Sequence, residues 1–119
     1  MPAAGAFPHR VSVQVRTEAS DGHRGLTETW ATRHRRWSAR VVELSGRDLE
    51  RARQIDPRIA IDVRLRFWSA YRDDLDGGRT RLVYHPTADS DEDRALDIIT
   101  PPAQIVDREE VQVLCKDVA

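Results

Sequence analysis

The histidines and the cysteine are the side chains of this sequence best suited to metal binding or proton transfer. The four histidines are His9, His23, His34 and His85, and no two of them stand three to five residues apart. That separation would place two imidazoles on one metal ion. A lone Cys115 offers no second thiolate for a zinc site or a disulfide. We therefore expect surface histidines, and Cys115 as a small apolar residue inside a strand.

An acidic run from Asp89 to Asp93 imitates the start of a calcium-binding loop. Arg94 stands where such a loop needs a glycine for its sharp turn, and Thr100 stands where it needs the closing glutamate. We interpret the run as a solvated acidic loop.

Nucleophilic and phosphate-binding motifs are equally incomplete. Gly77 and Gly78 are followed by Arg-Thr-Arg instead of the opening of a helix. Ser45 has no preceding glycine at the spacing of a nucleophile elbow, so helix capping explains it better. Since no nucleophile, base and oxyanion site assemble, we expect no enzymatic activity and no cofactor.

A basic and aromatic patch at Arg33 to Trp37, flanked by Trp30 and Arg40, is typical of small barrels that bind single-stranded nucleic acid. A nucleic-acid-binding β-barrel that uses Arg33 to Arg36 and the tryptophans is therefore the alternative function. Against it, Trp37 alternates in phase with Ala39 and Val41, which predicts that its ring points into the core.

Length and composition bound the fold. A chain of 119 residues supports one hydrophobic core, and a hydrophobic share of 39% makes that core thin. A thin core predicts that further burial occurs against partners. No apolar run reaches the roughly 18 residues of a membrane helix, and the start resembles no signal peptide, so we expect a protein that stays in the cytosol where it is made.

The net charge of -1 hides an asymmetry between the two halves of the chain. Residues 1–66 carry 13 arginines against 8 acids, whereas residues 67–119 carry 6 basic groups against 12 acids. Two fields of opposite sign would suit head-to-tail contacts between copies. Interleaving of both signs in the folded chain is the alternative.

Hydrophobic periodicity predicts mostly strands. Apolar and polar residues alternate in several short runs, and one run of helical period lies between Ser45 and Asp56. The strands are expected at 10–16, around 28–31, and at 37–43, 59–67, 81–84, 95–99 and 111–115. The turn between the second and third of these is expected near Arg35 to Trp37, where a hairpin would end. We predict a mainly β fold, a small antiparallel β-barrel with one short α-helix and long loops, in a single domain over 9–119 preceded by an N-terminal arm over 1–8.

Several segments in this order resemble the head–tail joining proteins of tailed bacteriophages, also called head-closure, head-completion or stopper proteins. The segments that carry the resemblance are His9–Gln14, Glu28–Trp30, Trp37–Ala39, Leu44–Leu49, Ala52–Gln54, Val63–Phe67 and Val113–Cys115. The likeness runs from about residue 9 to residue 117. The acidic stretch from His85 to Arg94 departs from it, since the family usually has a short hairpin turn there.

The resemblance implies a non-catalytic virion protein at the head–tail interface, assembled in the host cytoplasm. Such proteins form a sixfold or twelvefold ring below the portal and its adaptor and above the tail terminator or tail tube. The ring retains the packaged double-stranded DNA and lets it pass during ejection without reading its sequence. No membrane is involved.

The resemblance also implies one candidate site, and the aperiodic arm over 1–8 with the Gly-bearing loop over 20–27 predicts a second. The segment from Leu44 to Arg58 would line the lumen, gate it or contact neighbouring subunits, through Ser45, Arg47, Asp48, Glu50, Arg51, Arg53 and Asp56. The arm over 1–8 and the loop over 20–27 would order on docking to neighbouring rings, through Phe7, His9, Asp21, His23 and Arg24.

Overall fold

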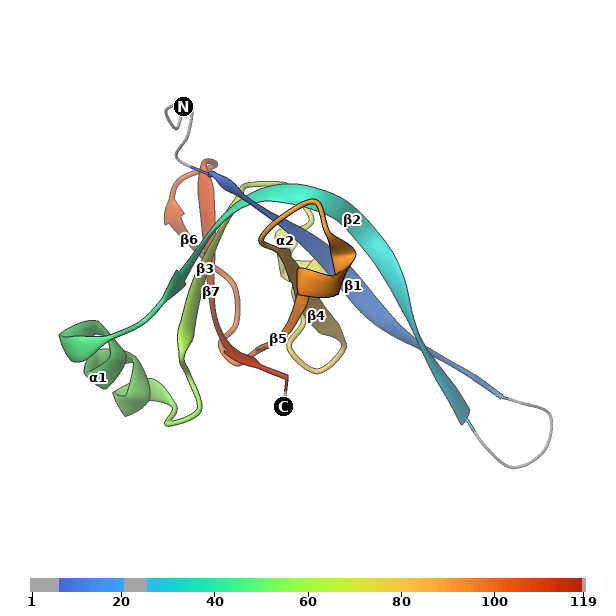
Figure 1. Cartoon of the computed structure of the whole chain (residues 1–119), viewed down its shortest axis with the longest axis horizontal. Coiled ribbons are helices and arrows are strands. Elements are labelled where there is room, and N and C mark those ends of the chain that lie inside the picture. The colour runs from blue at the N-terminus through green and yellow to red at the C-terminus, as the bar shows by residue number, and fades with distance from the viewer. Residues whose placement is uncertain (1–6, 21–25, 119) are drawn as a thin grey trace.

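The computed structural model describes residues 7–20 and 26–118, and it contains seven strands and three short helical segments within them (Figure 1). The strands are β1 (His9–Ser20), β2 (Leu26–Glu43), β3 (Ile61–Arg66), β4 (Thr80–His85), β5 (Arg94–Ile98), β6 (Ala103–Val106) and β7 (Glu110–Asp117). The helices are α1 (Gly46–Ile55), α2 (Tyr71–Asp74) and the 3₁₀ turn η1 (Ser90–Glu92).

Six of the strands close into an antiparallel barrel, which confirms the predicted fold class. The order is β3-β2-β1-β4-β5-β7, and β7 pairs back onto β3 from Ile61–Cys115 to Arg66–Glu110. β6 adds to the outer edge of β7. Closure removes the free edges that an open sheet of this size would expose.

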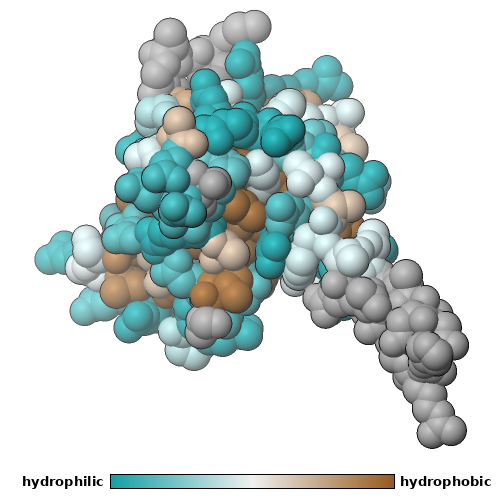
Figure 2. All heavy atoms as spheres, turned by 45° about the vertical axis from the view of Figure 1, so that its right-hand side comes forward, coloured by the Kyte–Doolittle hydropathy of each residue, from teal (hydrophilic) through white to brown (hydrophobic). Residues whose placement is uncertain are grey.

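The core lies inside this barrel and follows the alternation of the sequence. In β3, Ile61, Val63 and Leu65 are buried while the residues between them are more exposed. The same pattern in β7 buries Val111, Val113 and Cys115, which confirms Cys115 as a core residue. Burial raises the pKa of its thiol well above the usual range. On the face shown in Figure 2, apolar side chains reach the surface only in small patches between hydrophilic ones.

The expected turn near Arg35 to Trp37 is wrong, because β2 is one strand of 18 residues. Its pairing with β1 shifts register twice, between Val11 and Val13 and again between Val13 and Gln14. Arg36 adopts a left-handed backbone conformation, with φ of 51°, at the first shift. Extra residues in β2 bend the strand at these bulges, so it continues where a hairpin was expected.

The predicted helix is present as α1, and three further elements lay outside the prediction. Ser45 occupies the N-cap position but makes no side-chain capping hydrogen bond, so its predicted capping contact is absent. The missed elements are the single turn α2, the 3₁₀ turn η1 and the four-residue strand β6, which are too short to show a hydrophobic period. In Figure 1, α1 stands away from the barrel at one end of the molecule.

β1 and β2 extend beyond the barrel as a two-stranded ribbon at the opposite end from α1 (Figure 1). β1 pairs with β4 only from Arg10 to Val15, and β2 pairs with β3 only from Ala39 to Glu43. Beyond these pairings, no third strand of the described chain pairs with the ribbon. Of the residues proposed for docking, Asp21, His23 and Arg24 lie outside the described residues, as does the arm except Phe7 and Pro8.

The two charged halves of the sequence occupy two continuous arcs of the barrel. β3, β2 and β1 come from the basic half and are neighbours, while β4, β5 and β7 come from the acidic half and are also neighbours. The first arc carries eight arginines against four acids, but the strands of the second carry three basic and three acidic residues, so the excess of acids in that half lies between its strands. Among the described residues, no helix is long and apolar enough to cross a membrane.

Candidate functional site

The segment from Leu44 to Arg58 forms one projection from the barrel, which brings the predicted site residues together on α1 and its ends. Six of the seven are exposed and Asp56 is half-buried: Ser45, Arg47, Asp48, Glu50, Arg51, Arg53 and Asp56. Ala52 is the one residue of α1, all of which is described, that is buried. The helix thus presents a charged surface of both signs and has little attachment to the core.

A groove of about 420 Å³ separates α1 from the outward faces of β2, β3 and β7. Its lining combines apolar and polar side chains. The apolar members are Val42, Leu44, Ala52, Ile55 and Leu114, and the polar members are Arg40, Asp48, Arg51, Asp62, Arg64 and Gln112. Val42 is 38% exposed and Ile55 is 68% exposed. Apolar side chains in this groove therefore remain in contact with water in the single subunit.

Charges in the groove are only partly paired. Asp62 faces Arg64 at 3.4 Å and accepts a hydrogen bond from Gln112 at 2.9 Å. Among the described residues, no ion pair engages Arg40 or Arg51. The groove therefore offers two guanidinium groups without an ion pair among the described residues, together with apolar side chains.

Asp56 and Arg58 close the segment just after α1. The Asp56 carboxylate accepts hydrogen bonds from Nε and Nη2 of Arg58 at 3.0 and 2.9 Å and from its backbone N–H at 2.9 Å. The side-chain hydrogen bonds, followed by the backbone one, lower the pKa of Asp56 to about 2. This pair fixes the turn that leads from the helix back into β3.

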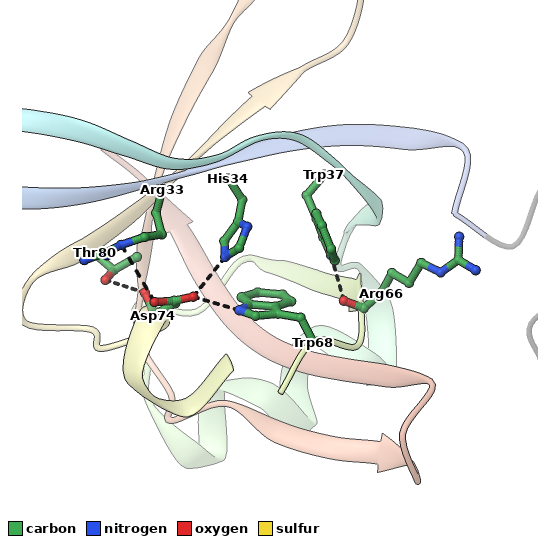
Figure 3. Close-up of polar contacts among 7 residues, drawn as sticks. All are labelled: Arg33, His34, Trp37, Arg66, Trp68, Asp74 and Thr80. Atoms are coloured by element: carbon green, nitrogen blue, oxygen red, sulfur yellow. Dashed lines mark hydrogen bonds and ion pairs between the residues drawn. The ribbon is translucent and has the colours of Figure 1, made fainter. Parts of the chain in front are cut away.

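In the Arg33 to Trp37 patch of the alternative function, His34 and Trp37 are half-buried in the barrel wall (Figure 3), whereas the three arginines are exposed. The Trp37 ring lies 5.4 Å from Trp68 and 5.2 Å from His34, and His34 lies 5.0 Å from Trp68. Trp37 Nε1 donates to the backbone oxygen of Arg66 at 2.7 Å. Trp37 packs against the core, as its alternation with Ala39 and Val41 predicted. These rings contact one another, which leaves less of their faces for a nucleic-acid base.

Asp74 holds this aromatic cluster from α2 (Figure 3). Its Oδ2 accepts a hydrogen bond from Trp68 Nε1 at 2.8 Å and lies 2.9 Å from His34 Nε2, while Arg33 Nε lies 3.8 Å from Oδ1. Burial raises the pKa of Asp74, but the contacts with His34, Trp68 and Arg33 outweigh burial and lower it overall. The side chains of His34 and Asp74 are 24% and 12% exposed, so the expectation of a surface His34 is wrong.

His85 is also half-buried, against expectation, because it bridges two strands and the acidic loop. Its Nε2 lies 2.7 Å from Ser12 Oγ and its Nδ1 lies 2.9 Å from Asp93 Oδ1. Asp93 is thereby taken out of the solvated loop that was predicted. Ser12 is only 4% exposed and lies under the β2 bulge, where Arg36 N–H donates to it. The arrangement therefore ties segments together and presents no open nucleophile.

Two of the residues predicted to take part in docking, His9 and Phe7, are described, and both contact the barrel. His9 Nδ1 accepts a hydrogen bond from the backbone N–H of Val41 at 3.0 Å, and its ring meets Tyr84 edge to face at 5.4 Å. His9 is therefore half-buried instead of a free surface residue. Phe7 is half-buried, and its carbonyl accepts a hydrogen bond from Arg10 at 3.3 Å.

Sequence reasoning missed Trp68, Asp74 and Ser12, which the fold brings to His34 and His85 from distant segments. Asp74 lies 40 residues from His34, and Ser12 lies 73 residues from His85. No local motif marks such pairs. Within the described parts of the chain, no group of three or more histidine, cysteine or acidic side chains is placed to hold a metal ion.

A family model described as phage head completion protein matches residues 2–118. The solution structure of a protein from Shigella flexneri 2a is similar, with a TM-score of 0.69 and 24% sequence identity, over 99% of this chain and 98% of that chain. At that identity the likeness shows a shared fold. No curated protein matches the chain.

Proposed function

The chain belongs to the phage head completion protein family, which makes it a structural component of the phage head, and from this premise we propose that it forms a ring at the head–tail joint. The ring retains packaged DNA, bridges the portal or its adaptor to the tail, and lets DNA pass during ejection. The observation that carries the proposal is the family match over residues 2–118, which spans nearly the whole chain.

A ring larger than a dimer needs a heterologous interface, in which one patch meets a different patch on the neighbour. The arc of β1, β2 and β3 carries eight arginines against four acids, whereas the segment 86–93 between β4 and β5 holds four acids and no basic residue. The proposed ring places the basic arc of one subunit against the acidic segments beside the other arc of the next.

The projecting segment Leu44 to Arg58 is proposed to face the lumen or a neighbouring subunit. Arg47, Glu50 and Arg53 are exposed on α1 and give it both signs of charge. A mixed surface attracts a phosphate backbone weakly, because the carboxylates oppose the counterion release that arginines alone would produce. Weak attraction suits a channel through which DNA must move.

Electron microscopy of the protein mixed with DNA-filled, portal-bearing heads tests this function directly. We expect added density with ring symmetry at one vertex of each head, and DNA that stays inside when those heads are diluted. Heads that gain no density at the portal vertex, at any protein concentration, would overturn the proposal.

Ionic strength tests the proposed charge pairing between arcs. Contacts between exposed opposite charges are screened at high salt, with a Debye length that falls from about 10 Å at 0.1 M to about 3 Å at 1 M. We therefore expect ring formation, followed by light scattering, to weaken as salt is added. Assembly that is equal at low and high salt would exclude electrostatic pairing as the source of the interface.

A further inference from the structure

The α1 groove contains two arginines that are register partners on neighbouring strands, Arg40 of β2 and Arg64 of β3. Like charges at directly paired positions destabilise a strand pair. Arg64 lies 3.4 Å from Asp62, whereas Arg40 makes no ion pair with any described residue. Arg51 reaches the same groove from α1 and also lacks such a pair. The groove therefore favours an anionic group that another molecule brings.

Exposed apolar side chains indicate what else that molecule should bring. Among the described residues, four large apolar side chains are exposed: Val42 at 38%, Ile55 at 68%, Ile105 at 39% and Val118 at 43%. Val42 and Ile55 both line the α1 groove, whereas Ile105 lies on β6 and Val118 follows β7. Burial of an apolar side chain stabilises a contact because its surface leaves water. An occupant of the groove should therefore carry an apolar side chain as well as an acid.

The hairpin of β6 and β7 carries both. Ile105 lies on β6, and Asp107 follows it at the turn, where it is exposed and makes no ion pair with any described residue. From residue 107 to residue 110 the sequence holds three acids against one arginine. The groove volume of about 420 Å³ lies in the lower part of the roughly 300–1,000 Å³ range of ligand pockets, so it admits a few side chains. A hairpin turn presents a few side chains, and its charge complements that of the groove.

The C-terminal end of β7, which carries Val118, fits the groove less well. The neighbouring acid, Asp117, accepts hydrogen bonds from Arg94 at 2.8 Å through both of its oxygens. Asp117 is therefore already paired and has less charge to offer to the arginines of the groove. The β6–β7 hairpin is the better occupant because Asp107 has no such partner.

The β6–β7 hairpin does not fill the groove of its own subunit, since neither Ile105 nor Asp107 is among the lining residues. β6 is paired to β7 near the turn, and β3 holds the same part of β7 on its other side. In Figure 1 the turn lies at the upper end of these strands, and α1 lies at the lower left. A contact between turn and groove therefore joins two copies through two different patches, as a heterologous interface requires.

We propose that the turn of the β6–β7 hairpin of one subunit docks into the α1 groove of a second copy of this chain. Asp107 pairs with the arginines of the groove that lack an ion pair, and Ile105 covers Val42 and Ile55. This contact rests on the proposed function, because it is one interface of the ring. It places an acidic segment of one subunit against the basic arc of the next.

Charge exchange tests the polar half of the contact, with assembly followed by light scattering. Arg51→Glu and Asp107→Arg each place like charges at the interface, so each variant alone should need at least about tenfold more protein to assemble. The double variant restores one opposite pair while Arg40 still faces the new arginine. It should therefore need at least about threefold less protein than either single variant.

Arg79→Glu is the matched control for charge. Arg79 is exposed, lies outside both the groove and the hairpin, and makes no ion pair with any described residue. This variant makes the same charge change as Arg51→Glu and should assemble like the unmodified protein. An equal loss of assembly in Arg79→Glu and Arg51→Glu would mean that net charge matters and the groove does not.

Serine substitution tests the apolar half. Ile105→Ser removes the side chain that covers the groove, so it should need about tenfold more protein to assemble. Val118→Ser is the matched control, because Val118 is exposed to a similar extent, and it should assemble normally. Equal losses of assembly in the two variants would contradict a specific role for Ile105.

Disulfide trapping gives a measurement that does not depend on charge. Ile55 and Ile105 are exposed and Cys115 is buried, so Ile55→Cys with Ile105→Cys adds two accessible thiols. Mild oxidation should give covalent ladders of subunits, whereas either single variant should give none beyond dimers. Ile55→Cys with Val118→Cys should give no ladder. Thermal unfolding of every variant confirms that it is folded before assembly is scored.

The outcomes separate this inference from the ring itself. If the unmodified protein forms rings on heads while both charge variants assemble like Arg79→Glu and Ile55→Cys with Ile105→Cys gives no ladder, the contact is wrong and the ring stands. A ladder from Ile55→Cys with Val118→Cys alone would place the C-terminal end in the groove and overturn the contact. If the ladder forms through Ile105→Cys but heads gain no ring, the contact stands and the proposed function fails.

Discussion

The backbone N–H of Arg36 donates a hydrogen bond to Ser12 Oγ at 3.1 Å, across the bulge that bends β2 over β1. Ser12 also contacts His85, which in turn contacts Asp93. The bulge places both His34 and Trp37 opposite inward-facing valines of β1, Val13 and Val11. A regular strand would put residues three apart on opposite faces, so the aromatic cluster depends on this one irregularity.

Arg36→Gly tests the strain at the bulge. Arg36 has φ of 51°, a conformation that costs a residue with a Cβ about 1–2 kcal/mol, whereas glycine adopts it freely at an entropic cost of about 0.5–1 kcal/mol. We expect Arg36→Gly to leave the free energy of unfolding unchanged or to raise it by up to about 1 kcal/mol in urea titrations. Arg35→Gly, at the neighbouring exposed position, should lower it by about 0.5–1 kcal/mol. Equal losses in both variants would contradict a strained Arg36.

Asp74→Ala tests the link between α2 and the aromatic cluster. Removal of the carboxylate leaves the partly buried donor of Trp68 and the nearby ring nitrogen of His34 without their acceptor, which costs about 1–3 kcal/mol of unfolding free energy. Tryptophan fluorescence should shift as well, because Trp68 loses its hydrogen bond. The exposed neighbour Asp73 is the control, and Asp73→Ala should change stability by less than about 0.5 kcal/mol. Similar losses of unfolding free energy in Asp73→Ala and Asp74→Ala would refute a specific role for Asp74.

The contribution of Asp74 to the free energy of unfolding depends on pH in a defined direction. Contacts with His34, Trp68 and Arg33 outweigh burial and lower the pKa of Asp74 in the folded protein, so its stabilisation is fully present above the unfolded pKa of about 4. That stabilisation disappears as pH falls through the folded pKa. The difference in unfolding free energy between the unmodified protein and Asp74→Asn should therefore be constant near neutral pH and shrink in acid. A difference in unfolding free energy that grows as the pH falls would show that the pKa of Asp74 is raised in the folded protein.

Much of the fold was predictable because its signals are local. The alternation in β1, β3 and β7 predicts a buried face, and those faces do line the barrel. The bend in β2 was not predictable, since Arg33 to Arg36 interrupts the period with exposed or half-buried residues that also read as a turn. After a bulge the strand keeps the same partner strand, whereas after a turn the chain pairs with a different one. Strand pairing involves residues far apart in the sequence, so a short stretch of sequence does not reveal it.

The candidate site, like the fold, was predictable only in part. The residues on α1 could be placed together because one short segment holds all of them. The groove beside them could not, since Val42, Asp62 and Leu114 reach it from three strands. Asp74 was missed for the same reason, because its partner His34 is 40 residues away and their contact exists only after the barrel closes.

Carboxyl titration by NMR tests the pair that ends the α1 segment. The hydrogen bonds from Arg58 lower the pKa of Asp56 to about 2, so its stabilising effect is present above about pH 4 and is lost as pH approaches 2. Arg58→Ala removes the side-chain bonds and keeps the backbone N–H. The pKa should then rise but stay below the ordinary value. An unchanged titration in the variant would show that the pair does not form in solution.

Thiol labelling tests whether the barrel is closed in solution. Cys115 has no exposed surface, and burial raises the pKa of its thiol, so neither access nor thiolate is available to a reagent in the folded state. An aromatic disulfide reagent should therefore react only as the protein unfolds, with a urea midpoint equal to that seen by fluorescence. Rapid labelling in native buffer would mean that β7 separates readily from β3 and β5.

Oligonucleotide binding separates the structural protein from a nucleic-acid-binding barrel. The rings of His34, Trp37 and Trp68 pack on one another, which leaves the exposed Arg35 and Arg36 without free stacking partners beside them. We expect the free protein to bind single-stranded DNA no more tightly than about 10⁻⁴ M at physiological salt, the weak end of nonspecific binding. The double variant Arg35→Ala with Arg36→Ala should bind as weakly, and so should the distant control Arg108→Ala. Tight binding that falls steeply with salt and is lost only in the double variant would establish the patch as a nucleic-acid site, because phosphate contacts release counterions.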